Sequence, residues 1–336
     1  MISVGRSREI GSEFWSVPTG EKPCGLFPPG TQWYLSGRAA LRAIVSELRD
    51  VNTVGVPDWC CDSMLLPFVE AGIEPLFYSA LDRYRQDFSA PDCDLLLVSD
   101  CFGWSGPPVD HSRVIRDLTH SIFSASRRDA NWYFGSLRKW CGFWTGGFAW
   151  SDHTLPAETG TDEAYCAMRR RAMEEKARYL AGDEIGDDRE AKEAYLRLFA
   201  QAEARLERCP PLAAAERDVR LAHHLDAELI RSRRRENAAV LMEAFPELLL
   251  FPQLGEEDCP LFVPILVPGG QRDGLRRYLI QQEIYCPVHW PLTALHRIGE
   301  DAKQLYENEL SLVCDQRYTT EDMRRIAEAI RAFRKG

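Results

Sequence analysis

The chain has 336 residues, of which 45% are hydrophobic and 27% charged, and its formal net charge is -10. This composition is typical of a globular protein, and the length favours a large domain plus a smaller one. The negative charge argues against general binding to nucleic acid or to an anionic membrane surface. No apolar run reaches the roughly 18 residues that a membrane span needs, and the N-terminal stretch MISVGRSREIGSEFW lacks the apolar core of a signal peptide.

The 11 cysteines are scattered from Cys24 to Cys314 and form no C-x-x-C pair. A disulfide framework or a zinc site would show tighter spacing. We therefore expect reduced thiols, a cytoplasmic location and no metal site. The adjacent Cys60 and Cys61 follow a predicted strand, and two packed thiols are the simplest interpretation of this pair.

Short apolar runs alternate with helical patterns from residue 36 to about residue 150. Leu41, Ile44, Val45 and Leu48 have the spacing of one helix face, and a second helix is expected over 65–71. Five buried strands are predicted, at 53–57, 74–78, 94–99, 114–117 and 147–150. This alternation indicates βαβ units and a mostly parallel sheet with both faces covered.

The chain changes character over 162–206, where two charged helices are expected on either side of the sequence AGDEIGDD. A third helix, over 216–244, carries the arginine-rich run 231–235. We interpret this run as a solvated helix face, with a contact to an anion or a partner as the alternative.

The pattern shifts again after residue 245, to a strand near 261–267 and then to further helices. Strands mixed with helices fit a small α+β domain. We therefore predict a large domain over 30–240, which includes the helical segment 162–206, and a small domain over 245–336. The N-terminal segment 1–29 is expected to pack near the small domain.

Ser36, Gly37 and Arg38 come directly before the first predicted helix. Backbone N–H groups at a helix N-terminus form an anion site, and glycine lets a phosphate group approach closely. Arg38 adds a charged donor. These residues form a candidate phosphate site, and a serine cap followed by a solvated arginine is the alternative.

Asp117 and His120 lie at the end of the predicted strand 114–117. A carboxylate at the carboxyl end of such a strand faces the crevice in which α/β proteins bind ligands. It can keep a pyridine nitrogen protonated, so that the ring accepts electrons from a substrate carbanion. The alternatives are a turn or cap for Asp117 and a packed histidine for His120.

Lys139 follows Ser136 by three residues in the sequence SLRKW. A lysine that forms a Schiff base needs apolar neighbours or a second cation to favour its neutral form. Trp140 supplies apolar bulk and Arg138 supplies charge, while Ser136 can reach a phosphate. The alternative is an exposed Arg-Lys pair in a loop.

A stiff segment from Pro287 to Pro291 contains His289 and Trp290. The imidazole and the indole could line a substrate pocket, and a structural turn is about equally consistent with the residues. Arg317, near the end of the chain, is a third candidate substrate contact.

The order of these motifs resembles fold-type-I enzymes that depend on pyridoxal 5'-phosphate (PLP), and more closely the DegT/DnrJ/EryC1/StrS aminotransferase family. The matching segments are SGRAAL at 36–41, VPDWCCDSMLLPFVEAGIEPLFY at 56–78, DCFGW at 100–104, RDLTHS at 116–121, FGSLRKW at 134–140 and LSLVCDQRY at 310–318. The resemblance implies an α/β fold, with a large, mostly parallel domain and a small C-terminal α+β domain. It also implies a homodimer whose interface completes the active site.

The resemblance further implies a role for each matching residue. Lys139 is the expected Schiff-base lysine and proton shuttle, and Asp117 the partner of the pyridinium nitrogen. His120 is expected near the phenolic oxygen of PLP. The other expected cofactor contacts are Gly37, Arg38 and Ser136 at the phosphate, and Trp59 or Cys61 near the ring face.

The sugar aminotransferases of this family carry a Gly-Tyr-Asn segment that reaches the phosphate of the neighbouring subunit. This chain has no such segment near 205–235, and has the charged helices of 162–206 instead. We expect an aminotransferase that moves an amino group from an amino acid to a keto or aldehyde acceptor, either a sugar or another biosynthetic intermediate. Decarboxylation, elimination and a PLP-fold protein that binds without turnover are the alternatives, and Lys139 with Asp117 favours an enzyme.

Overall fold

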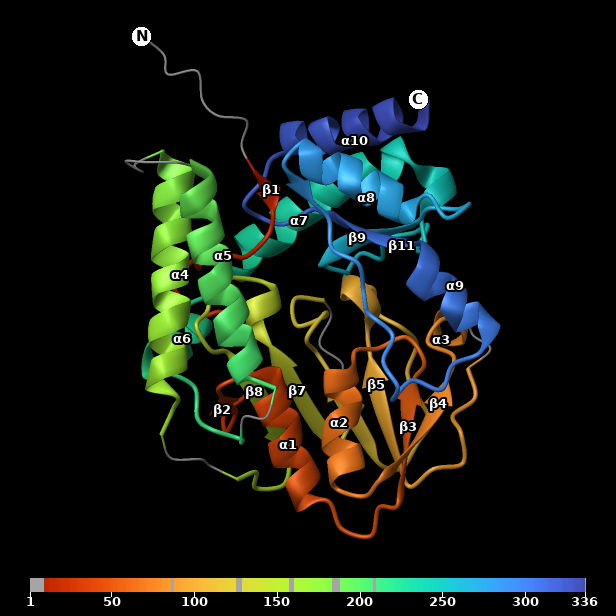
Figure 1. The fold of residues 1–336 in the computed structure, drawn as a ribbon. Helices are drawn as coiled ribbons and strands as arrows, with labels where there is room; N and C mark the ends of the chain where they lie inside the picture. Colours follow the sequence, from red (N-terminus) through yellow and green to blue (C-terminus); the bar gives the residue numbers. More distant parts are fainter. Residues whose placement is uncertain are drawn as a thin grey trace.

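The computed structural model describes residues 9–85, 88–124, 129–156, 160–182, 188–207 and 210–335. Residues 1–8 of the predicted N-terminal segment lie outside this part of the chain, and so do residues 183–187 of the AGDEIGDD sequence. The fold consists of a large sheet with helices on both faces and a second, smaller layer of strands and helices (Figure 1).

The large sheet has seven strands in the described residues. In spatial order they are β2 (Gln32–Tyr34), β8 (Gly147–Ser151), β7 (Trp132–Ser136), β6 (Val114–Asp117), β5 (Leu95–Ser99), β3 (Thr53–Pro57) and β4 (Glu74–Tyr78). Strands β4, β3, β5, β6 and β7 run parallel, and β8 pairs antiparallel with both β7 and β2. The mostly parallel sheet is confirmed, and all five predicted strands form. The sequence analysis missed β2 and β7.

Apolar side chains explain why this sheet is covered on both faces. Leu95, Leu96 and Leu97 of β5 are all fully buried although neighbouring side chains point to opposite faces. Helices α1 (Gly37–Glu47) and α2 (Asp62–Glu70) share a core with the strands on one face. On the other face the core includes Phe148 of β8 and Ala222 of α6 (Glu216–His223).

The two charged helices are confirmed as α4 (Glu163–Ala181) and α5 (Asp188–Arg205). They pack against each other and stand side by side along one edge of the molecule, where they reach from the large sheet to the level of β1 (Figure 1). Tyr165 and Cys166 of α4 pack with Ala202 of α5 and Leu206, directly after it, in one small core.

The helix predicted over 216–244 is two helices, α6 and α7 (Ala227–Ala244). The helix is interrupted at residues 224–226 because Asp226 caps α7. Its carboxylate accepts a hydrogen bond from the N–H of Leu229 at 3.0 Å. Leu225, at this break, forms a β-bridge with Thr19. A single helix would leave no place for that contact.

The interpretation of 231–235 as a solvated face is wrong for three of its arginines. The first of them, Arg231, donates to the carbonyl oxygen of Phe123. Arg234 is fully buried, donates hydrogen bonds to the carbonyl oxygens of Pro260 and Leu261, and lies 4.5 Å from the centre of the Trp140 ring. Arg235 donates to the carbonyl oxygen of Gly255 at 2.8 Å. These side chains hold the chain's own loops, so they are poor candidates for a contact across a subunit interface.

The smaller layer contains β9 (Phe262–Leu266) paired antiparallel with β11 (Glu309–Val313), and β1 (Ile10–Gly11) paired parallel with β10 (Ile284–Tyr285). Its helices are α8 (Arg272–Gln281), α9 (Glu300–Asn308) and α10 (Thr320–Lys335), and a short helix α3 (Asp82–Arg85) belongs to the large layer. Through β1, the N-terminal segment pairs with a strand of the smaller layer.

One apolar core joins β9, β11 and α10 to the second half of α7, through Ala238 and Leu241. The predicted boundary between the large and the small domain, at 240–245, stays a prediction. We propose that the smaller domain includes this second half of α7. No helix in the described residues is long and apolar enough to cross a membrane.

Candidate active site

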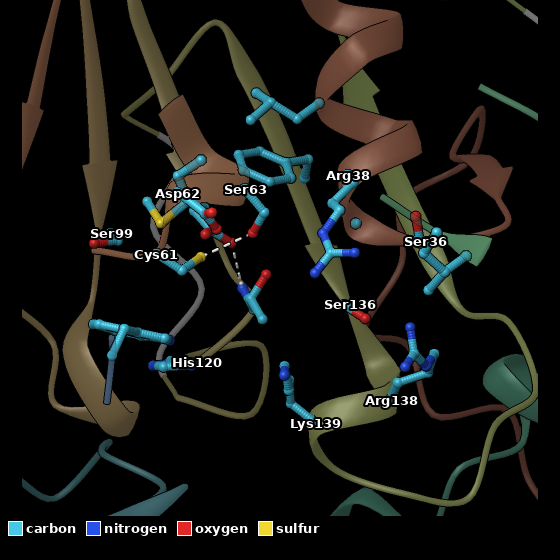
Figure 2. A pocket seen from close by; sticks show the side chains of 18 of the residues that line it. Ser36, Arg38, Cys61, Asp62, Ser63, Ser99, His120, Ser136, Arg138 and Lys139 are labelled. Atoms are coloured by element: carbon cyan, nitrogen blue, oxygen red, sulfur yellow. Dashed lines mark hydrogen bonds between the residues drawn. The ribbon is translucent and has the colours of Figure 1, made fainter. Parts of the chain in front are cut away.

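A cavity of about 290 Å³ opens at the carboxyl ends of the parallel strands (Figure 2). Ser99 of β5, Asp117 of β6 and Ser136 of β7 each line it from the last position of their strand. Parallel strands align these ends, which is why ligands bind there in open α/β sheets. The predicted residues that line this cavity are Gly37, Arg38, Cys61, Asp117, His120, Ser136, Lys139 and Trp290.

The N-terminus of α1 closes one side of the cavity. Ser36 caps the helix, its hydroxyl accepting a hydrogen bond from the N–H of Ala39 at 3.2 Å. A Cβ atom on Gly37 would lie 3.2 Å from the Cβ of Ser136, so glycine lets this first turn approach β7 closely. The N–H groups of a first helical turn have no partner within the helix, and they form an anion site beside Ser136.

A short 3₁₀ turn, Leu137–Lys139, brings Lys139 into the cavity directly after β7. Leu137 is fully buried, and its N–H donates to the carbonyl oxygen of Gly146 at 2.9 Å. This anchor leaves Lys139 on the open side of the turn, where its side chain points toward the middle of the cavity (Figure 2). Trp140 is buried below it and donates its ring N–H to the carbonyl oxygen of Thr119 at 2.8 Å.

Asp117 is a buried carboxylate at the end of β6. Its Oδ1 accepts a hydrogen bond from the N–H of Thr119 at 2.7 Å, and no ion pair with Asp117 forms within the described part of the chain. Burial raises the pKa of Asp117 to about 6, the negative charge of Asp100 adds to this rise, and Lys139 opposes it. A positively charged N–H group placed against Asp117 would relieve the cost of burying its charge.

His120 lies across the cavity from Arg38 in Figure 2. Burial, together with the charge of Lys139, lowers the pKa of His120 to about 3, so the ring is neutral. Its Nδ1 accepts a hydrogen bond from the N–H of Phe102 at 3.5 Å, which leaves the ring proton on Nε2. Trp290 stacks on this imidazole, with 5.6 Å between ring centres and 18° between planes.

Cys61 lines the cavity just before α2, and its Sγ lies 2.9 Å from the hydroxyl of Ser63. Burial raises the pKa of the Cys61 thiol, so it is protonated at neutral pH and unsuited to act as a nucleophile. Ten cysteines in the described residues are free thiols.

Trp59 was expected near the face of the cofactor ring. The structure places it behind the wall of the cavity instead. Trp59 is fully buried, and its ring N–H donates to the carbonyl oxygen of His289 at 2.8 Å. Its ring centre lies 5.7 Å from that of Trp290, which does line the cavity. Trp59 therefore supports the wall from behind, held there by its hydrogen bond to the backbone of His289.

His289 also lies behind the wall. Its backbone N–H donates to the Oε2 atom of Glu309 at 3.0 Å, and its ring Nδ1 lies 2.9 Å from the hydroxyl of Ser311. Glu309 and Ser311 are both fully buried in β11. The predicted substrate contact at 289–290 is therefore divided, with Trp290 reaching the cavity and His289 tied to the smaller sheet.

Arg317 does not line the cavity. It pairs with Asp315 at 2.8 Å and donates to the carbonyl oxygens of Ser12 and Glu13 at 3.2 and 3.0 Å. Its guanidinium also lies 3.9 Å from the centre of the Phe14 ring. The prediction of a substrate contact is not supported by this position, in which Arg317 fastens the N-terminal segment.

Sequence reasoning missed Glu203, which lines the cavity from the last turn of α5. Its carboxylate pairs with Arg38 and with Arg138. The signal lay in the helical spacing, because Glu203 falls at i+4 from Phe199 and i−3 from Leu206, on the apolar face of α5. Its side chain is 47% exposed, so Glu203 lies at the edge of that face, where it can reach both arginines.

No protein-family model matches this chain, and no curated protein matches its sequence. Solved structures match over most of its length. One is an aminotransferase of the DegT/DnrJ/EryC1/StrS type from Brucella abortus, with a TM-score of 0.56, 14% identity, and 90% of this chain and 85% of that one covered. Another is PseC from Helicobacter pylori, an aminotransferase of pseudoaminic acid biosynthesis, with a TM-score of 0.60, 14% identity and coverage of 96% and 99%.

A third match is NtdA from Bacillus subtilis with bound cofactor PMP, with a TM-score of 0.57, 12% identity, and 91% of this chain and 73% of that one covered. At these identities the likeness concerns the fold. The expected fold-type-I architecture is thereby confirmed, and the chain has the fold of these proteins.

Proposed function

We propose that this protein is a PLP-dependent aminotransferase. The observation that carries the proposal is the meeting of Lys139, Asp117 and the N-terminus of α1 in one cavity at the carboxyl ends of the sheet. PLP needs an amine for its aldehyde, a carboxylate for its ring nitrogen and N–H donors for its phosphate. The cavity offers all three.

The fit to PLP rests on chemistry that the cavity leaves unsatisfied. Burial raises the pKa of the Asp117 carboxylate, and a pyridinium N–H placed against it would stabilise its charged form. Gly37, Arg38 and Ser136 would hold the phosphate, with Cys61 near the ring. When bound, the ring would act as a sink for the electrons of the substrate carbanion.

The chain's own residues have separable tasks in this proposal. Lys139 would hold the cofactor and could carry the proton that leaves the substrate carbon. His120, neutral and with its proton on Nε2, would offer a hydrogen-bond donor to the phenolic oxygen of the cofactor. Trp290, stacked on His120, excludes water from that side of the cavity.

The substrates follow from the same chemistry. An amino acid donates the amino group, and a keto or aldehyde compound accepts it. The structural match to PseC, an aminotransferase of pseudoaminic acid biosynthesis, supports a sugar-like acceptor. We also propose a homodimer, as the resemblance implies, and a cytoplasmic location in keeping with the free thiols.

A half-reaction tests this function. The purified protein is loaded with PLP and given L-glutamate without any acceptor, while visible absorbance and the released keto acid are followed. We expect loss of the cofactor band and about one equivalent of keto acid per site. Carbon dioxide release, elimination products or an unchanged spectrum with every amino acid tried would contradict an aminotransferase. Sedimentation tests the dimer, since an active 38 kDa species would rule it out.

A further inference from the structure

Arg234 of α7 is fully buried, and its guanidinium contacts three separate segments of the chain. Nη1 donates a hydrogen bond to the carbonyl oxygen of Leu261, directly before β9, at 2.8 Å. Nε donates to Oε1 of Gln316, after β11, at 2.8 Å. The guanidinium also lies 4.5 Å from the centre of the Trp140 ring. One side chain thus joins the smaller layer to the residue that follows Lys139.

Gln316 continues this link to the backbone beside Lys139. Its Nε2 donates a hydrogen bond to the carbonyl oxygen of Trp140 at 2.7 Å. The orientation of the amide is fixed by its two partners, because a guanidinium only donates and a carbonyl oxygen only accepts. Arg234, Gln316 and Trp140 therefore form one chain of hydrogen bonds, which ends one residue after the lysine.

The position of Lys139 depends on the contacts of its neighbours. Its turn closes through the N–H groups of Trp140 and Cys141, which donate to the carbonyl oxygen of Leu137 at 2.9 and 3.1 Å. The ring of Trp140 is tied to the large sheet side, and its carbonyl oxygen to Gln316. The Gln316 amide therefore sets where the end of the turn lies, and with it the direction of the Lys139 side chain.

The same guanidinium reaches the other side of the cavity through two peptide groups. Leu261, whose carbonyl oxygen accepts from Arg234, donates its N–H to the carbonyl oxygen of Phe102 at 2.7 Å. The N–H of Phe102 in turn donates to Nδ1 of His120 at 3.5 Å. Arg234 is therefore connected to both Lys139 and His120, which are proposed to contact neighbouring groups of the cofactor.

Stability alone accounts poorly for a charge at this place. Nη2 of Arg234 is buried and has no hydrogen-bond acceptor among the described residues. An unsatisfied buried donor is costly, and apolar side chains often replace buried charges without loss of stability. A guanidinium is instead suited to fixing several segments at once, because its planar set of donors points in defined directions.

We propose that Arg234 and Gln316 are positioning residues, which hold the Lys139 side chain in the direction required for covalent attachment of PLP. The inference rests on the proposed aminotransferase function and adds two residues to it. Neither side chain is among those that line the cavity, so both act through the backbone of Trp140.

The first substitution, Gln316→Glu, replaces a single nitrogen by oxygen. It keeps an acceptor for Arg234 but removes the donor to Trp140, and the new carboxylate repels that carbonyl oxygen. Gln304→Glu is the matched control, since it makes the same change at an exposed position of α9.

The second substitution, Arg234→Lys, keeps the positive charge but loses the planar set of donors. Its matched control is Arg272→Lys. Arg272 donates to the carbonyl oxygens of Tyr306 and Glu309, each at 3.1 Å, and so ties backbone segments within the smaller layer.

Two measurements are made on each protein after removal of any bound cofactor. Hydrogen exchange of the backbone N–H groups of Trp140 and Cys141, followed by mass spectrometry, reports how often the turn opens. The rate of covalent attachment of PLP is followed by absorbance, with borohydride trapping to identify Lys139. Binding of 4-deoxypyridoxine 5'-phosphate, which has a methyl group in place of the aldehyde, reports the rest of the cavity.

We expect both N–H groups to exchange about 3- to 10-fold faster in Gln316→Glu and Arg234→Lys than in their controls, since each loses a hydrogen bond that holds the turn. Attachment of PLP to Lys139 should slow by a similar factor. The affinity of Gln316→Glu for 4-deoxypyridoxine 5'-phosphate should match that of Gln304→Glu, because this ligand does not react with the lysine.

Three results would overturn the inference. Equal exchange in Gln316→Glu and Gln304→Glu would show that the amide does not hold the turn. Faster exchange with an unchanged rate of attachment would reduce the pair to a structural tie. An equal loss of affinity for the analogue would mean that the substitution disturbs the whole cavity. A wild type that attaches no PLP would instead refute the aminotransferase, while the difference in exchange would remain.

Discussion

The backbone of Thr119 links the two residues on which the proposed chemistry depends. Its N–H donates to Oδ1 of Asp117 at 2.7 Å, and its carbonyl oxygen accepts the ring N–H of Trp140, which follows Lys139, at 2.8 Å. The turn after β6 and the turn after β7 are thus held together by one peptide segment. This link sets the position of the carboxylate relative to the lysine before any ligand binds.

Replacing Lys139 with alanine should abolish covalent attachment of PLP. In the wild type, borohydride treatment should fix the cofactor to the peptide that contains Lys139, as mass spectrometry would detect. The matched control is Lys22→Ala, which removes an exposed lysine far along the chain from the cavity. Cofactor fixed to a different lysine in Lys139→Ala would refute the assignment.

Replacing Asp117 with asparagine should leave PLP bound but slow the reaction. An amide cannot stabilise a positively charged ring nitrogen, and a neighbouring charge of this kind shifts a pKa by about 1–3 units. Each unit corresponds to about 1.4 kcal/mol, so kcat should fall at least about 10-fold. Turnover at the wild-type rate, with cofactor occupancy verified by absorbance, would remove Asp117 from the mechanism.

The affinity for PLP should fall as the pH drops below about 6. Burial raises the pKa of Asp117 to about 6, so below this pH the group is neutral and cannot pair with a pyridinium. The cofactor phosphate also gains a proton near pH 6, so the diagnostic quantity is the difference between wild type and Asp117→Asn. Parallel pH profiles of the two dissociation constants would count against this role.

The stability of the fold should depend on Glu309. This residue is 0% exposed, and burial raises its pKa to about 8, far above the ordinary value of 4.5. Because the folded state binds the proton more tightly, the stabilisation is fully present below about pH 4.5 and is lost as the pH rises through 8. The slope between these limits is about 1.4 kcal/mol per pH unit.

Urea unfolding of wild type and Glu309→Gln at several pH values between 5 and 8 measures this contribution. Glutamine keeps a hydrogen-bonding oxygen but cannot ionise, so the unfolding free energy of the wild type should fall relative to the variant as pH rises. A difference that stays constant with pH would show that Glu309 has an ordinary pKa.

Gly147→Ala should destabilise the protein. A Cβ atom there would lie 2.1 Å from the carbonyl oxygen of Ser36, so α1 would have to move away from β8. Overpacking of this kind costs about 1–3 kcal/mol. Gly299→Ala is the control, since no atom lies within 4 Å of a Cβ at that position. Equal unfolding free energies for the two variants would contradict the close approach of α1.

Much of the candidate site could be predicted from local sequence. Gly37 opens a predicted helix, and Asp117 ends a predicted strand. Ser136 belongs to the short motif that contains Lys139. Parallel strands bring such ends to one edge of the sheet, so residues far apart in sequence were expected to meet. The resemblance to PLP enzymes added the roles, which remain proposals for each residue.

The sequence by itself determined the alternation of strands and helices, and with it the fold. The spacing of apolar residues along the chain shows which segments bury one face and which bury both. Only the tertiary structure decided which side chains face the cavity. Trp59, His289 and Arg317 are turned to other partners by contacts with segments distant in sequence. Glu203 reaches the cavity because the end of α5 lies beside the first turn of α1, where Arg38 pairs with it. Such placements depend on how whole helices and strands pack together, which a local sequence pattern does not show.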